Sequence, residues 1–195
     1  MNEAAEDPRV RRTLQAARQA IFSLMTERRY DDIRVADIIE RAGVASSTFY
    51  EHFAGKDDAV VKCMAFLLGI LAGCVDEASN EAEVRRTLEH FWENRRLARP
   101  LLVGRPHGRI ARSLADLIAT RLSAIKGTSR LAPRLVAAQL SEGMLALLVG
   151  WLLGEASAST EALASMMRAS AQASVRLLFD PAGNPVRPPT GAARP

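Results

Sequence analysis

The fold is decided by residues 35–58, which read VADIIERAGVASSTFYEHFAGKDD. The apolar residues of this stretch are spaced so that two short helices can pack against each other across a tight turn. Gly43 lies at the reversal, where glycine adopts a positive φ without steric cost. The pattern predicts one helix over 35–42 and a second that ends near Phe53, which together form a helix-turn-helix.

Helical periodicity continues on both sides of this motif, and the alternation typical of a strand is absent from the sequence. The sequence therefore predicts an all-α protein, in which an N-terminal three-helix helix-turn-helix domain is joined by a long helix to a C-terminal helical bundle. The further helices are expected at 8–28, 56–78, 81–96, 109–126, 133–153 and 160–179. The expected domains are 1–55, 56–179 and a disordered, proline-rich tail at 180–195.

Composition narrows the class of protein. The chain has 195 residues, of which 48% are hydrophobic and 25% charged, which is typical of a globular domain and excludes collagen and full disorder. The nearly uncharged stretches 64–75 and 143–154 are shorter than the 18 or so residues of a membrane-spanning helix, so we expect buried helices and no membrane partner. The acidic start is no secretory signal, so a cytoplasmic protein is expected.

The two cysteines are predicted to be free thiols. Cys63 and Cys74 lie on one expected helix, and a rise of 1.5 Å per residue separates them by about 16 Å. This exceeds the limit of ~7 Å for the two Cα atoms of a disulfide.

Charge alone does not locate a nucleic-acid surface. The formal net charge is +4, but residues 1–62 hold 10 Lys+Arg against 11 Asp+Glu. The strongest positive bias is in residues 95–134, which contain ten basic residues and one acidic residue, Asp116. Most of that positive charge is expected on a solvated side of a helix.

The second helix of the motif carries small hydroxyls at its start and longer hydrogen-bond donors one turn later. These residues are Ser46, Ser47, Thr48, Tyr50 and His52. A helix of this kind fits the major groove of DNA, about 12 Å wide, with its N-terminal residues at the base edges.

Over about residues 10–60 the chain resembles the TetR family of transcriptional repressors. The resemblance rests on Arg41-Ala42-Gly43-Val44, on the block from Thr48 to Phe53, and on Lys56 after a glycine. It implies that Ser46, Ser47 and Thr48 face bases or nearby phosphates, and that Tyr50, His52 and Lys56 contact the DNA backbone.

The second helix holds no Arg, Lys, Asn or Gln, so bidentate base contacts are not expected from it. We expect Arg11 and Arg34 to compensate, with reliance on phosphate contacts and DNA shape. Each residue also has a structural alternative: Tyr50 as a half-buried aromatic, Lys56 as a solvated lysine, and Ser47 or Thr48 as a helix cap.

The resemblance further implies a homodimer on double-stranded operator DNA and a small-molecule effector. Small residues in the expected helices 133–153 and 160–179 are compatible with a dimer interface; the alternative is an ordinary intrachain core. Candidate residues lining an effector pocket, each of which could instead be core, are Phe66, Phe91, Trp92, His107, Met144 and Trp151.

Arg121 is a further candidate for the effector pocket. At 100° per residue it lies about 20° from Ile110, inside an apolar stripe, where a charge needs a partner. We expect either an anionic effector or a carboxylate such as Glu89 or Glu142; the alternative is an arginine that binds the carbonyls of its own last helical turn.

Nothing in the sequence indicates catalysis. With three histidines the chain lacks the spacing motifs of zinc, di-iron, nucleotide-binding and serine-hydrolase sites, so no enzyme activity, cofactor or metal is expected. The rival to a DNA-binding regulator is an all-helical protein-interaction module that does not bind DNA.

Overall fold

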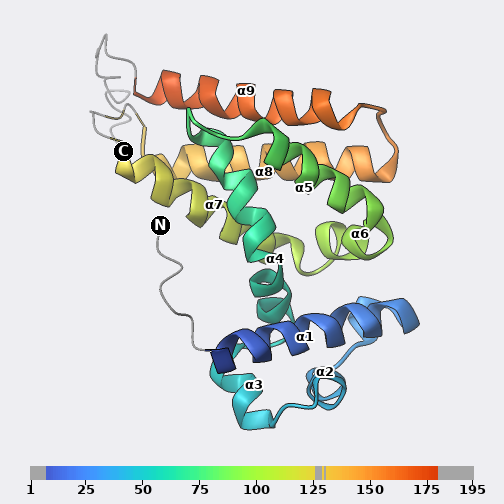
Figure 1. Ribbon diagram of the computed structural model, residues 1–195. Helices are drawn as coiled ribbons and strands as arrows, with labels where there is room; N and C mark the ends of the chain where they lie inside the picture. The colour runs from blue at the N-terminus through green and yellow to red at the C-terminus, as the bar shows by residue number, and fades with distance from the viewer. Residues whose placement is uncertain (1–7, 126–128, 130, 180–195) are drawn as a thin grey trace, which may run out of the picture.

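The computed structural model describes residues 8–125, 129 and 131–179, and over these residues it contains helices and no strand. The elements are α1 (Pro8–Glu27), η1 (Tyr30–Asp32), α2 (Val35–Ala42), α3 (Ser46–His52), α4 (Lys56–Ala72), η2 (Gly73–Val75), α5 (Glu81–Glu93), α6 (Arg95–Val103), α7 (His107–Ala124), α8 (Pro133–Leu153) and α9 (Thr160–Leu178). Figure 1 shows α1–α3 as a small lobe at one end, from which α4 leads into a larger helical bundle. The predicted all-α architecture is confirmed; the tail predicted at 180–195 lies outside the described residues.

The helix-turn-helix forms where it was predicted. Gly43 ends α2 with φ of 64°, in the left-handed region that glycine enters without strain. Phe49 and Phe53 of α3 are fully buried, and so is Ile38 of α2. These side chains form one core with α1, so the polar side of α3 is turned outward.

Charged side chains fasten α2 to α1. The Arg41 guanidinium donates to both carboxylate oxygens of Glu27 at 2.7 and 2.9 Å, and to the hydroxyl of Ser23 at 2.6 Å. The hydrogen bond from Arg41 holds the pKa of Glu27 below its usual range. Asp37 accepts from the backbone N–H of Arg34 at 2.7 Å, which caps the start of α2. Helix α2 is therefore held at its start by Asp37 and near its end by Arg41.

The short helix η1, which the sequence did not predict, joins α1 to the start of α4. Tyr30 is 3% exposed, and its hydroxyl donates to the Asp57 carboxylate at 2.6 Å. Burial, and then this hydrogen bond, raises the pKa of Tyr30. The Lys56 ammonium donates to the carbonyls of Tyr30, Asp31 and Ile33 at 2.8, 3.1 and 2.7 Å and lies 4.6 Å from the centroid of the Tyr30 ring. This junction sets how the small lobe meets α4.

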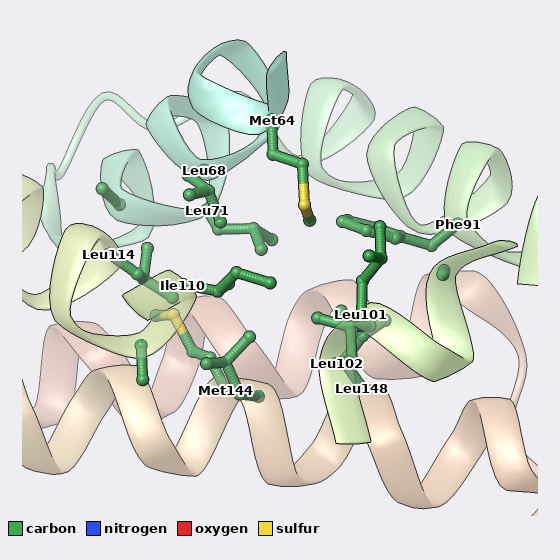
Figure 2. Packing of buried hydrophobic residues seen from close by; sticks show 14 of the residues in the cluster. Met64, Leu68, Leu71, Phe91, Leu101, Leu102, Ile110, Leu114, Met144 and Leu148 are labelled. Carbon is green, nitrogen blue, oxygen red and sulfur yellow. The ribbon is translucent and has the colours of Figure 1, made fainter. Parts of the chain in front are cut away.

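The core of the larger bundle is apolar and is formed mainly by α4, α7 and α8. Figure 2 shows side chains from all three helices converging: Leu68 and Leu71 from α4, Ile110 and Leu114 from α7, and Met144 and Leu148 from α8. All six are buried. Cys63 and Cys74 are free thiols, as predicted, and burial raises their pKa values to about 11 and about 12.

The predicted end of the helix at 81–96 is wrong. It stops at Glu93, and a further helix, α6, follows directly with Pro100 inside it. The sequence favours a loop there because proline has no N–H to donate within a helix. Burial of Ala98, Leu101 and Leu102 against the bundle outweighs that loss. The predicted long helix 56–78 also ends early, at Ala72, and continues as η2.

By length and composition alone, Lys56–Val75 and Pro133–Leu153 are each apolar enough to cross a membrane. The expectation that no segment reaches this length is therefore wrong, because one or two charged residues, such as Glu142 in the middle of Pro133–Leu153, leave the mean hydropathy of the segment high. Of the most apolar window in each, 44% and 50% of the residues are buried inside the fold. Both helices contribute buried residues to the bundle core.

We predict that Tyr30→Phe lowers the free energy of unfolding by about 1–3 kcal/mol, because it removes a hydrogen bond to a charged acceptor at a buried site. Tyr50→Phe is the matched control, since that hydroxyl is on an exposed ring, and should change stability by less than about 0.5 kcal/mol. Urea unfolding of both variants measures the difference. Equal stabilities would show that the Tyr30–Asp57 bond contributes nothing.

Candidate functional site

The outer side of α3 is a polar surface at the far end of the small lobe. Ser46 and Ser47 are exposed, Tyr50 is 57% exposed, and Thr48 and His52 are half-buried. Figure 1 shows α3 on the side of the lobe that faces away from the bundle. The sequence-predicted residues of this helix are therefore brought together on one accessible surface.

Buried aromatic rings hold this surface in place. The Phe49 and Phe53 rings lie with centroids 4.8 Å apart, and the edge of the Tyr50 ring packs against Phe49 at 5.6 Å and 88°. The N-cap is Ala45, which offers no side-chain oxygen, so the alternative in which a serine or Thr48 caps the helix is not observed. Among the described residues, the side chains of Ser46, Ser47, Thr48 and Tyr50 have no hydrogen-bond partner. Their hydroxyls are available to an external ligand.

The positive charge near α3 comes from other elements. Arg11 on α1 and Arg34 before α2 are both exposed, and the side chain of neither has an ion-pair partner among the described residues. Lys62, by contrast, donates to the carbonyl of His52 and pairs with Asp58 at 3.1 Å. Arg11 and Arg34 are thus two cations of the described residues that a phosphate could meet.

The expectation that Lys56 contacts the DNA backbone does not fit the structure. An ammonium has three N–H donors, and those of Lys56 point to three backbone carbonyls of residues 30–33. The side chain is half-buried beneath Tyr30. A lysine at the start of α4 is therefore explained by its hydrogen bonds to η1 and to Ile33, and the sequence did not predict η1.

The predicted effector-pocket residues do not surround one cavity. Phe66 and Phe91 line a cavity of about 510 Å³ between α1, α4, α5 and α6. Trp92 and Trp151 pack with ring centroids 4.8 Å apart and planes tilted by 34°, and they line a different cleft, of about 470 Å³, beside the α8–α9 connection. Met144 lies in the bundle core. The sequence indicated which aromatic residues could line a pocket. It could not show that the tryptophans and the phenylalanines line two separate hollows.

His107 and Arg121 are structural links between helices. His107 joins the carbonyl of Leu102, at 2.6 Å from Nδ1, to the carboxylate of Glu142, at 3.2 Å from Nε2. Arg121 donates to the carbonyls of Leu117 and Gly69 at 3.3 and 3.2 Å.

The carboxylate partner of Arg121 is Asp76, at 3.4 Å, rather than Glu89 or Glu142. The charge in the apolar stripe is thereby paired with Asp76, the residue that directly follows η2, whose position the sequence did not reveal. The alternative in which Arg121 binds carbonyls of its own helix is observed in part, through Leu117.

The sequence did not point to two cavity residues on α1. Arg18 and Phe22 line the 510 Å³ cavity although α1 belongs to the helix-turn-helix lobe. Nothing in their local pattern distinguishes them from solvated and core residues of an amphipathic helix. Among the described residues there is no group of three or more His, Cys, Asp or Glu side chains that could hold a metal ion.

Comparison with known proteins supports the fold and the motif. Residues 17–61 match the family profile described as bacterial regulatory proteins, tetR family. A crystal structure of a TetR transcriptional regulator from Streptococcus agalactiae 2603V is 25% identical, with a TM-score of 0.51, and the match covers 87% of this chain and 99% of that chain.

A TetR-family transcriptional regulator from Syntrophomonas wolfei is 17% identical, also with a TM-score of 0.51, covering 87% of this chain and 98% of that one. No curated protein matches the sequence. With the tetR-family motif at its N-terminus and the same helical architecture along the chain, the protein has the helix-turn-helix domain and the fold of TetR-family transcriptional regulators.

Proposed function

We propose that this protein is a sequence-specific DNA-binding transcriptional regulator that acts as a homodimer in the cytoplasm and is a repressor released from its operator by a small-molecule effector. The observation that carries the proposal is the outer side of α3, where hydroxyl groups without partners are held on a rigid aromatic base. The proposed division places DNA binding in residues 1–55 and dimerisation and effector binding in residues 56–179.

In the proposed complex α3 lies in the major groove. Ser46, Ser47 and Thr48, at its start, meet base edges, while Tyr50 and His52 donate to phosphates. Arg11 and Arg34 supply charge to the backbone on either side. Because α3 has no Arg, Lys, Asn or Gln, sequence discrimination depends strongly on phosphate positioning and on DNA shape.

The proposal of a dimer follows from the short length of α3. One helix of seven residues covers a few base pairs, so two copies with twofold symmetry are needed for a specific site. The proposed interface is formed by α8 and α9, which keep apolar residues exposed along their length: Leu135, Leu147, Leu153, Met166 and Leu177. Exposed small residues lie between them, Ala138, Gly143 and Ala146 on α8 and Ala162 and Ala169 on α9, and allow close helix approach.

Two hollows among the described residues are lined by the predicted aromatic residues, the cavity between α1 and α4–α6 and the cleft beside Trp92, and are the candidate effector sites. Both volumes fall within the range of roughly 300–1,000 Å³ found for small-molecule sites. An effector that prefers one arrangement of the two lobes shifts the population away from the DNA-binding spacing.

We predict that Tyr50→Ala weakens binding to the intergenic DNA upstream of its own gene about tenfold, with Tyr50→Phe intermediate, because the ring supports α3 and the hydroxyl meets phosphate. An electrophoretic mobility shift at several salt concentrations measures this. Affinity that does not fall with salt, or that is unchanged in both Tyr50→Ala and Ser47→Ala, would instead favour an interaction module.

Lys56→Met separates the structural role of Lys56 from a DNA contact. We expect a loss of about 1–3 kcal/mol in the free energy of unfolding, because three carbonyls lose a charged donor. At a temperature where the variant is folded, DNA affinity should change less than twofold. Unaltered stability together with a large loss of DNA affinity would place the ammonium on a phosphate.

We predict that Leu147→Glu converts the dimer to a monomer at micromolar concentration, because two copies of the added charge would be buried at the interface. Val103→Glu is the matched control, since Val103 is an exposed apolar residue at the end of α6 and is not part of the proposed α8–α9 interface. Size-exclusion chromatography with light scattering gives the mass of each. A monomeric wild type, or a dimeric Leu147→Glu, contradicts the proposed interface.

A further inference from the structure

We infer that the cavity between α1, α4, α5 and α6 binds a small organic anion with an apolar body, and that this ligand acts directly on the DNA-binding lobe. The inference rests on the proposed function for its regulatory part. The ligand class and its location are argued from the cavity alone. Its volume of about 510 Å³ suits a single small molecule.

The inner wall of the cavity is apolar. Met64 of α4, Phe91 of α5 and Leu101 of α6 line it and are buried. Figure 2 shows these three side chains pointing toward one another from their separate helices. An alkyl or aryl group is the matching chemistry, since such a wall offers no hydrogen bond to a polar ligand.

Phe66 lies at the solvent-exposed edge of the cavity. Phe66 lines the cavity yet is 78% exposed, the largest exposure among the large apolar side chains of the described residues. An apolar ligand that fills the cavity offers this ring the contact that the free protein does not. Burial of the ring then adds to the affinity for an apolar body.

The polar side of the cavity is basic. Arg18 of α1, His90 of α5 and Asn94, which lies between α5 and α6, line it, and no Asp or Glu of the described residues does. The Arg18 guanidinium has no ion-pair partner among the described residues. Arg18 and Cys63 line the same cavity, which places the guanidinium at the cavity wall. A carboxylate or a similar anion on the ligand would neutralise this charge.

His90 adds a second donor for the same anion. The Asn94 side-chain amide lies 3.4 Å from Nδ1 of His90 and also donates to the His90 carbonyl at 2.9 Å. In the tautomer whose Nδ1 accepts from this amide, the ring proton is on Nε2. Arg18 and His90 thus line the cavity from the two lobes with groups that can donate to an anion, whereas the Arg18 charge would repel a cationic ligand.

The position of the cavity makes it a regulatory site. Its wall includes Arg18 and Phe22 of α1, the helix to which Arg41 and Glu27 fasten the helix-turn-helix. The remaining wall belongs to α4–α6. A ligand that spans both sides fixes the angle of the small lobe relative to the bundle, and in a dimer this angle sets the separation of the two recognition helices.

The test uses three probes with one alkyl chain and different head groups: octanoate, 1-octanol and octylammonium. Isothermal titration calorimetry with the full chain is expected to show octanoate binding at least about tenfold more tightly than the other two. Arg18→Gln should lower the octanoate affinity about tenfold and leave 1-octanol unchanged. Arg12→Gln, an exposed arginine of the same helix outside the cavity, is the matched control and should bind octanoate like the wild type.

Leu97→Trp tests the location, because the larger side chain fills the cavity; it should abolish octanoate and 1-octanol binding alike. Equal binding of the three probes, no binding, or octanoate binding unaffected by both Arg18→Gln and Leu97→Trp would overturn the inference. A mobility shift with octanoate separates this result from the proposed function. If octanoate binds as expected but the protein never shifts DNA, the site stands and the DNA-binding proposal fails.

Discussion

The packing of Phe49 and Phe53 against α1 is the constraint on which the rest of the molecule depends. A helix of seven residues is too short to be stable alone, so α3 exists because its aromatic side is buried. The same burial turns its hydroxyl side to solvent. A surface that could read DNA is thus a consequence of core formation in a very small domain.

Helix α1 carries this constraint to the remainder of the chain. It holds α2 through Arg41 and Glu27, and it leads into η1, where Tyr30 and Lys56 fix the start of α4. On its other side it forms part of the wall of the cavity. Helix α1 therefore contacts α2, the connection between the lobes and the proposed anion site. A displacement of α1 would change the packing at all three.

Much of the fold could be predicted from the sequence, because its strongest signals are local. Gly43 predicted the turn, and the limits of α2 and α8 agree with their apolar periods and, for α8, with Pro133 at its start. Helix α6 was missed because Pro100 opposes a helix locally, while the burial that stabilises it comes from distant residues. The site was predicted unevenly for the same reason. The residues of α3 share one short helix, but the partner of Arg121 is 45 positions away in the chain.

By itself the sequence determined the helical class, the helix-turn-helix and the identity of the residues on its outer side, since these follow from spacings within one or two helical turns. The tertiary structure decided which groups remain available. It placed Lys56 on three carbonyls, paired Arg121 with Asp76, separated the tryptophans from Phe66 and Phe91, and left Arg18 beside an apolar cavity. Whether a charged or aromatic side chain is free or engaged depends on partners that are close in space and far apart in the chain, and only the packed fold brings them together.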